Sequence, residues 1–391
     1  MKRKRIFFRN NGLSPVEIIR HRLLPEDLHL KWPQFENRKV IYTHLGRIGN
    51  VLLCKLWNIQ AGDEILVPSY NCGSEVDPFI WFGMKVVMYR IDDRLKIDVE
   101  DLYQRITNKT RIIYVTHYFG WPHPLEDIKK ICSNKNIYLV EDCALSLFSN
   151  GPDGPIGLVG DGAIHSFKKT LPVADGGALT LLSNYDLNSQ PGTQPAFGVI
   201  AKETIPIILR WFISSSQSIP IVSDSLFYVG NNLSKFESDL PFLENLDMPK
   251  DYYFSEHVMA WTISRISAGI LKSSDPHKIF NCKRKNFKRL RDGIIEINNI
   301  KLLLENLPEG VCPLLFPLKV SDVFKWIREL NTMGIKATRW WEGFNQKLNW
   351  DDFPEAKNLK QKLLVLPVHQ DLSDEDIDYM VTSIKRVAKS I

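Results

Sequence analysis

The stretch Arg111-Ile-Ile-Tyr-Val115, followed by Leu125 to Cys132 and then by Ile137-Tyr-Leu-Val140, decides the fold class. The first and last of these segments are short and apolar, which is typical of strands covered on both faces. In the middle segment, apolar residues recur every three or four positions, at helical spacing. A strand, a helix and a second strand in this order predict a unit with parallel strands.

The same alternation extends over residues 64 to 182. Short apolar runs predict further strands, and a helical pattern precedes them. The runs are Ile65-Leu-Val67, Lys85-Val-Val-Met-Tyr89, Ala163-Ile164 and Ala178-Leu-Thr-Leu181, and the helix is Val51 to Trp57. Strands that alternate with helices are typical of an α/β domain with a mostly parallel sheet.

The last third of the chain has a different order of elements. A long helix is expected to begin at Ser255, and Ser373-Asp-Glu-Asp376 is a capping-box pattern that predicts the start of the last helix. Between them we expect extended runs and one capped helix: Leu314 to Val320, a Ser321-capped helix to about Met333, Ile335 to Thr338, and Leu363 to Val368. We therefore predict two domains. Residues 1–253 form a large α/β domain with an N-terminal arm and a segment, 183–253, that fits no pattern, and residues 254–391 form a small α+β domain.

The composition is that of a folded chain. The 391 residues are 44% hydrophobic, 24% charged and 11% aromatic, which excludes a disordered or fibrous protein. The stretch Ile205 to Val222 is interrupted by Arg210 and falls short of a membrane span. The basic first residues lack the apolar core of a signal peptide. The six cysteines form no CxxC pair, so we expect reduced thiols, a cytoplasmic protein and no metal site.

The formal net charge is +5, and the excess lies in the first five residues and in Lys283 to Arg291, where six of nine residues are basic. This run is either a solvated helix face or a surface that attracts a phosphorylated ligand. No nucleic-acid recognition motif accompanies the charge, so we expect no nucleic-acid partner.

The residues that suggest chemistry are Asp142, at the end of one expected strand, and Lys169, shortly after another. Both are expected at the carboxyl ends of a parallel sheet, where such folds bind ligands. A lysine near a carboxylate suits Schiff-base chemistry with pyridoxal phosphate (PLP), because the carboxylate can pair with the protonated pyridine nitrogen. A purely structural ion pair is the alternative.

Five ordered motifs together resemble the DegT/DnrJ/StrS sugar aminotransferase family of fold type I PLP enzymes. They are Gly62-Asp-Glu-Ile-Leu-Val-Pro-Ser69, His117-Tyr-Phe-Gly120, Val140-Glu-Asp142, Ser166-Phe with Lys169 to Gly177, and Leu366-Pro-Val-His369-Gln-Asp-Leu-Ser-Asp-Glu-Asp376. The likeness runs from about residue 40 to the C-terminus, apart from roughly 185 to 250. It implies that the large domain binds PLP and that the protein is a homodimer.

The resemblance also implies roles for single residues. Lys169 is identified as the lysine that bonds the cofactor, because it lies six positions before Asp175-Gly-Gly. Asp142 matches the aspartate that binds the pyridine nitrogen, and Ser166 matches a hydroxyl that contacts the phosphate. Gly46-Arg47 falls on the turn whose N–H groups hold the phosphate at a helix start. Arg47 replaces a hydroxyl residue there, so we expect its guanidinium to add a charged contact. A glycine-rich turn without a ligand is the alternative.

Some positions depart from the family pattern. Cys72 stands where an aromatic side chain usually stacks on the pyridine ring, and Leu145 where His or Gln is usual. Tyr70 is either the replacement stacking ring or half-buried packing. His117 is either a ligand contact or a structural histidine. Trp340 and Trp341 lie where members of the family line the sugar site, with core packing as the alternative.

The resemblance implies an aminotransferase that moves an amino group from glutamate or glutamine to a keto group of a nucleotide-linked sugar, in polysaccharide or glycan biosynthesis. One alternative is another PLP reaction on a keto sugar, such as dehydration. Relatives that dehydrate carry histidine at the lysine position, so Lys169 argues against it. The other alternative is a regulatory or scaffolding protein that binds PLP without catalysis, which the changes at Cys72 and Leu145 suggest.

Overall fold

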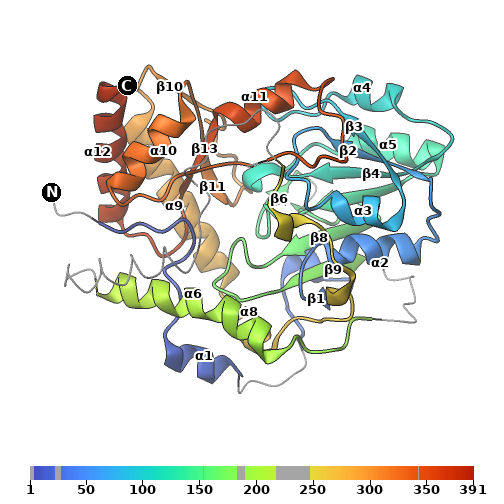
Figure 1. Cartoon of the computed structure of the whole chain (residues 1–391), viewed down its shortest axis with the longest axis horizontal. Coiled ribbons are helices and arrows are strands. Elements are labelled where there is room, and N and C mark those ends of the chain that lie inside the picture. Colours follow the sequence, from blue (N-terminus) through green and yellow to red (C-terminus); the bar gives the residue numbers. More distant parts are fainter. Residues whose placement is uncertain (1–3, 23–27, 153, 183–189, 217–246, 342) are drawn as a thin grey trace.

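The computed structural model describes residues 4–22, 28–152, 154–182, 190–216, 247–341 and 343–391. Its larger sheet has seven strands in the order β1-β9-β8-β5-β4-β2-β3 (Figure 1). They are β1 (Lys39–Thr43), β2 (Glu64–Pro68), β3 (Lys85–Tyr89), β4 (Thr110–Thr116), β5 (Tyr138–Asp142), β8 (Gly162–Ser166) and β9 (Gly177–Leu181). All neighbours from β3 to β8 are parallel, whereas β9 runs antiparallel to both β8 and β1. The predicted α/β class with a mostly parallel sheet is confirmed.

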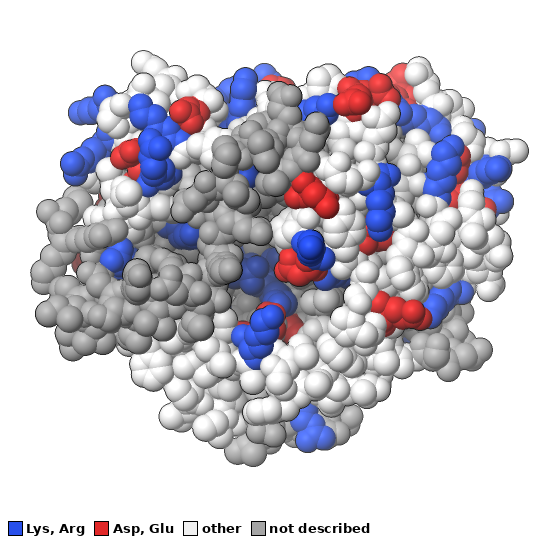
Figure 2. Space-filling view, in the orientation of Figure 1, with Lys and Arg blue, Asp and Glu red and all other residues white. Residues whose placement is uncertain are grey.

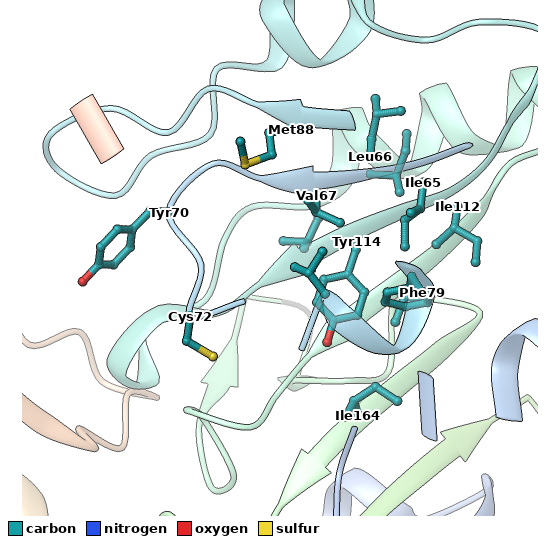
Figure 3. Packing of buried hydrophobic residues seen from close by; sticks show 14 of the residues in the cluster. Ile65, Leu66, Val67, Tyr70, Cys72, Phe79, Met88, Ile112, Tyr114 and Ile164 are labelled. Atoms are coloured by element: carbon teal, nitrogen blue, oxygen red, sulfur yellow. The ribbon is translucent and has the colours of Figure 1, made fainter. Parts of the chain in front are cut away.

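Helices pack against this sheet. Helix α2 (Ile48–Leu56) contacts β1, β8 and β9, α3 (Asp77–Phe82) contacts β3, and α5 (Glu126–Lys135) contacts β5. Every residue of β2 is buried, as expected for a strand covered on both faces. Figure 3 shows side chains of β2 and β4 packed together. The remaining elements of this part are α1 (Pro15–Arg22), α4 (Val99–Gln104), the 3-10 helices η1 (Pro33–Phe35) and η2 (Tyr118–Gly120), and the paired strands β6 (Asn150–Gly151) and β7 (Gly154–Pro155).

A second, antiparallel sheet has the order β10-β11-β13-β12. Its strands are β10 (Ile300–Leu302), β11 (Leu315–Val320), β12 (Thr338–Arg339) and β13 (Leu363–Pro367), and the helices around it are α9 (Pro276–Ile294), α10 (Val323–Thr332), α11 (Pro354–Lys362) and α12 (Asp374–Ser390). The capping box that begins α12 is present at Ser373 and Asp376, as predicted. The N-terminal arm packs here too, because Ile6 forms a parallel bridge with Ile335.

Two helix starts differ from the predictions. No long helix begins at Ser255. Instead a 3-10 turn, η4 (Glu256–Val258), precedes α8 (Arg265–Ser273), whose N-cap is Ser264. The Ser264 hydroxyl accepts a hydrogen bond from the Ser267 N–H and so caps the helix. The Ser255 side chain makes no such capping bond to η4. Helix α10 is capped by Asp322 rather than Ser321, because the Asp322 carboxylate accepts from the N–H of the third helical residue.

In its described residues, the segment 183–253 contains the helix α6 (Phe197–Ser215) and the 3-10 turn η3 (Lys250–Tyr252). Residues 183–189 and 217–246 of this segment lie outside the described residues, as does the end of the stretch Ile205 to Val222. Among the helices that are described, none is long and apolar enough to cross a membrane.

The basic run lies on α9, and most of its charges have partners within the chain. Lys283 is 2% exposed and donates to the Pro313 carbonyl, and Arg284 donates to two carbonyls of the following loop. Lys285 and Arg289 pair with acidic residues in the first turns of α12. The run therefore joins two helices of the small sheet. Figure 2 shows basic and acidic side chains interspersed over the face in view.

Candidate functional site

A cavity of about 170 Å³ lies at the carboxyl ends of the parallel strands. Its walls come from β4, β5 and β8, from the start of α2, and from loops that follow β2 and β12. The lining residues are Leu45, Gly46, Arg47, Asn50, Cys72, Ser74, Glu75, Tyr114, Asp142, Ala144, Ile164, Ser166, Lys169 and Trp341. In Figure 3 the Cys72 thiol and the Tyr114 hydroxyl point toward the region of Ile164.

All five residues predicted as a site line this cavity: Gly46, Arg47, Asp142, Ser166 and Lys169. They are up to about 120 residues apart in the sequence. The parallel neighbours β5 and β8 end at Asp142 and Ser166, and the turn at Gly46 lies against the end of β8, where a Cβ on Gly46 would be 2.8 Å from the His165 carbonyl oxygen. The geometry supports the prediction that they act together. The role of each remains a prediction.

Asp142 is 4% exposed, and its Oδ1 accepts from the Ala144 N–H at 2.9 Å. Burial raises the pKa of this carboxyl, whereas the positive charge of Lys169 lowers it. A buried carboxylate that faces a cavity is stabilised by a cationic ligand group. Protonated pyridine is such a group.

Two further polar side chains, Asn50 and Tyr114, line the cavity beside Asp142. The Tyr114 hydroxyl interacts with the side chains of Asn50 and Asp142, but neither the Asn50 Oδ1 nor this hydroxyl completes a hydrogen bond of normal geometry to a described residue. The three side chains form a buried polar cluster to which a polar ligand can add hydrogen bonds. Sequence reasoning missed both residues. Tyr114 lies inside an apolar run and Asn50 directly before the helical pattern that begins at Val51, and neither position carries a signal of its own.

The two adjacent lysines have different surroundings. Lys169 lines the cavity, whereas the Lys168 Nζ is 2.8 Å from the Glu203 carboxylate on α6. Of this pair, Lys169 is the one that lines the cavity, and its predicted role as the reacting lysine stays a prediction.

The Asp175-Gly-Gly motif fixes the turn before α2. The fully buried Asp175 carboxylate accepts from the Ser264 and Ser267 hydroxyls and lies 2.9 Å from the His44 Nδ1. The Gly176 N–H donates to the His44 carbonyl at 2.7 Å. A Cβ on Gly177 would lie 2.3 Å from the nitrogen of Gly46, so only glycine permits this approach.

The turn itself has the polarity of an anion site, and the Arg47 side chain, which lines the cavity, also bonds a distant segment of the chain. The N–H groups of Gly46 and Arg47 donate to no carbonyl among the described residues, and α2 begins directly after them. The Arg47 guanidinium donates to the Tyr252 and Asp251 carbonyls, at 2.6 and 2.9 Å. These two bonds orient the guanidinium toward the chain at residues 251 and 252.

The loop with Cys72 offers no stacking ring. The Cys72 N–H and thiol both donate to the Glu75 carboxylate, and burial raises the pKa of the Cys72 thiol to about 12. Tyr70 does not line the cavity: its hydroxyl donates to the Trp340 carbonyl, and it points away in Figure 3. Trp341 is the aromatic side chain of the small-domain loop that does line it, while Trp340 packs against Phe8 and Phe119.

His117 has a structural environment. Its Nδ1 accepts from the His123 N–H, and its Nε2 lies 3.0 Å from the Glu141 carboxylate. The nitrogen and oxygen atoms of this pair and the Cys143 thiol lie within 4.8 Å of one another. However, the Glu141 carboxylate also accepts hydrogen bonds from three loop N–H groups, so both of its oxygens already have hydrogen-bond partners. Leu145 is fully buried in the core.

A mostly parallel sheet with a cavity at its carboxyl edge, joined to a small antiparallel sheet, is the fold of the sugar aminotransferases among the fold type I PLP enzymes. A sugar aminotransferase described as putative from Streptococcus pneumoniae, in a form with PLP, superposes with a TM-score of 0.68 at 18% identity, over 99% of this chain and 99% of that one. The Helicobacter pylori aminotransferase of pseudoaminic acid biosynthesis superposes with a TM-score of 0.71 at 14% identity, over 99% and 100%. These likenesses show the fold.

Part of the sequence matches a family of known proteins. Residues 35–188 match the DegT/DnrJ/EryC1/StrS aminotransferase family, so the resemblance seen in the motifs is confirmed. GDP-perosamine synthase from Escherichia coli O157:H7 is 28% identical over 155 residues, which are 37% of this chain and 43% of that protein. GDP-4-keto-6-deoxy-D-mannose 3-dehydratase from Escherichia coli O55:H7 is 29% identical over 136 residues, which cover 32% of this chain and 35% of that protein. The matched segment thus spans less than half of these curated relatives.

Proposed function

We propose that this chain is a PLP-dependent aminotransferase that transfers an amino group from glutamate or glutamine to a keto group of a nucleotide-linked sugar, in polysaccharide or glycan biosynthesis. The observation that carries the proposal is that Lys169 and the buried carboxylate of Asp142 line one cavity, beside the polar side chains of Asn50 and Tyr114. The cavity lies in the segment that matches the family.

PLP, when bound, supplies an electron sink that stabilises negative charge at the substrate carbon. Lys169 provides the amine that bonds the carbonyl carbon of the cofactor. The same amine would move a proton at the substrate carbon as a general base. Lys168 stays paired with Glu203 and does not compete.

Asp142 holds the proton on the pyridine nitrogen. The Ala144 N–H fixes the orientation of its carboxylate, and its burial makes the interaction with a cation stronger than it would be in water. Tyr114 and Asn50 lie beside it and offer a hydroxyl and an amide oxygen to polar atoms of the ligand.

The phosphate is held by the backbone N–H groups of Gly46 and Arg47 and by the Ser166 hydroxyl. The N–H groups stand at the positive end of α2, where an anion is favoured. The Asp175 contacts keep this turn in place. Arg47 is therefore a cofactor-binding residue through its backbone N–H group.

A dehydratase remains the second candidate, because one relative of similar identity is a 3-dehydratase. The lysine at position 169 favours amino transfer, because the resemblance implies histidine there in relatives that dehydrate. A PLP binder without catalysis is the third candidate, and it is motivated by the thiol at position 72.

We further propose a cytoplasmic homodimer with a large domain over residues 1–253 and a small domain over 254–391. The bridge between Ile6 and Ile335 makes the N-terminal arm a tie between the two domains. Light scattering of the purified protein would give the oligomeric state.

The deciding experiment is an absorbance spectrum of the purified protein with PLP, before and after glutamate or glutamine. Lysine-bound PLP absorbs near ~420 nm, and an amino donor removes this band only if the first half of an amino transfer takes place. A band that no amino acid removes would favour the non-catalytic candidate. Release of water from a keto sugar without an amino donor would favour the dehydratase.

A further inference from the structure

Residues 247–254, called the strap below, pack on loops that line the cavity. A Cβ on Gly343 would lie 2.6 Å from the first carbonyl oxygen of the strap, and a Cβ on Gly73 would lie 2.7 Å from the Met248 sulfur. Both glycines have a positive φ. The strap is therefore in close contact with the loop that carries Cys72 and with the loop that follows Trp341.

Arg47 connects the strap to the third cavity loop, the turn before α2. Its two terminal nitrogens donate to the successive carbonyls of Asp251 and Tyr252, at 2.9 and 2.6 Å. Two hydrogen bonds from one rigid guanidinium fix both position and orientation. Arg47 also lines the cavity, so the contact lies beside the ligand space.

The far end of the strap is fixed through Asp77, which is 1% exposed. Its carboxylate accepts from the Phe254 N–H at 2.7 Å and from the Lys347 ammonium at 2.8 Å. The same ammonium lies 5.0 Å from the centre of the Tyr253 ring. The strap is thus held at both ends, and Arg47 is the tie on the cofactor side.

We propose that Arg47 is a positioning residue for the substrate side of this cavity. Its guanidinium holds the strap, the strap holds the loops of Cys72 and Trp341 at a fixed distance, and these loops shape the space above the cofactor. The cofactor phosphate is left to the backbone of the turn and to Ser166. This inference rests on the proposed function, because it takes the cavity to be a site for PLP and an amino donor.

The experiment compares Arg47→Ala and Arg47→Lys with the wild type, with Lys55→Ala as the matched control. Lys55 is an exposed cation on the same helix and does not touch the strap. Three quantities are measured: hydrogen exchange of the strap amides, PLP affinity from absorbance titration, and the rate of band loss against donor concentration. The donor is whichever of L-glutamate and L-glutamine converts the wild type.

In Arg47→Ala we expect strap amides to exchange at least ~10-fold faster, because two charge-assisted hydrogen bonds are lost. PLP affinity should stay within about threefold, while the donor concentration for half-maximal rate rises severalfold and the maximal rate changes little. Arg47→Lys should lie between, because an ammonium keeps the charge but not the paired geometry. Lys55→Ala should match the wild type.

Two results would overturn the proposal. A PLP affinity at least ~10-fold weaker with unchanged strap exchange would make Arg47 a phosphate ligand. Faster strap exchange with an unchanged donor dependence would show that the strap does not shape the site. If Arg47→Ala fails to fold, Arg47→Lys decides by the same readouts.

If the proposed aminotransferase function is wrong, the result differs from a failure of the Arg47 proposal, because the wild type then converts no amino donor at all. Strap exchange and PLP affinity in the variants would then still decide whether the guanidinium holds the strap or the phosphate.

Discussion

The two walls of the cavity are built in different ways. One wall, called the motif wall, consists of residues 44–47, 142–144 and 166–177. Its parts are joined by the Asp175 carboxylate and by glycine contacts between adjacent strands. The other, called the loop wall, consists of residues 70–75, 340, 341 and 343. Its shape depends on the strap and on packing between distant loops.

The difference separates the wall that carries the proposed reacting groups from the wall that shapes the remaining space. The groups proposed to act on PLP, Lys169 and Asp142, stand on the motif wall, where short strands and backbone contacts determine their positions. The loop wall carries Cys72 instead of an aromatic ring, and its remaining aromatic side chain, Trp341, comes from the small-domain loop. A change on the loop wall alters the shape of the site, whereas a change on the motif wall removes a reacting group.

The largest effect is expected for Lys169→Ala. This variant should lose the PLP band near ~420 nm and amino transfer by at least ~10³-fold, because no other lysine lines the cavity among the described residues. Lys168→Ala is the control, and it should stay within about twofold, since it loses only the contact with Glu203. Borohydride trapping followed by peptide mapping identifies the bonded lysine. A label on Lys168 would show that the motif has been read in the wrong register.

Asp142→Asn should keep PLP but lose amino transfer by roughly 10²- to 10⁴-fold, because an amide does not stabilise a pyridinium by charge. Burial raises the pKa of Asp142, so the ionised carboxylate destabilises the fold as the pH rises through that pKa. Without cofactor, the Asp142→Asn variant should therefore be at least as stable as the wild type without cofactor at pH 7. Single-turnover rates measure the loss of amino transfer, and thermal unfolding measures the change in stability. Near-normal turnover would remove the role proposed for Asp142.

Asp175→Asn should act on stability first. The carboxylate accepts from two serine hydroxyls and an N–H group in a fully buried position, so the amide should lower the free energy of unfolding by about 1.5 to 3 kcal/mol. Asp292→Asn, on the surface of α9, should change it by less than ~0.5 kcal/mol. Urea unfolding gives both values. Equal stability of the two variants would mean that Asp175 does not hold the motif wall together.

The sequence predicted the motif wall and most of the sheet because their signals are local. Apolar runs located the strands, and Lys169 was found by its distance from Asp175-Gly-Gly. The first helix of the last third was misplaced, because its cap, Ser264, is fixed by the distant Asp175. For the same reason the position of the Arg47 side chain was not foreseen. Its partners are carbonyls some 200 residues away, and main-chain acceptors leave no signal in the sequence.

The smallest effect concerns the reactivity of Cys72, and it tests whether the loop wall carries chemistry of its own. Burial and the neighbouring Glu75 carboxylate raise the pKa of the Cys72 thiol to about 12, so it is protonated at neutral pH. In a Cys282→Ser background, which removes the half-exposed cysteine, iodoacetamide should label Cys72 slowly. The rate should rise about tenfold per pH unit from pH 7 to 9, in proportion to the thiolate, and mass spectrometry of the peptide follows it. Bound PLP should slow the labelling, since the thiol lines the same cavity as Lys169. A rate that reaches a plateau near pH 8 would mean that Cys72 is a thiolate paired with Lys169, and both walls would then carry reacting groups.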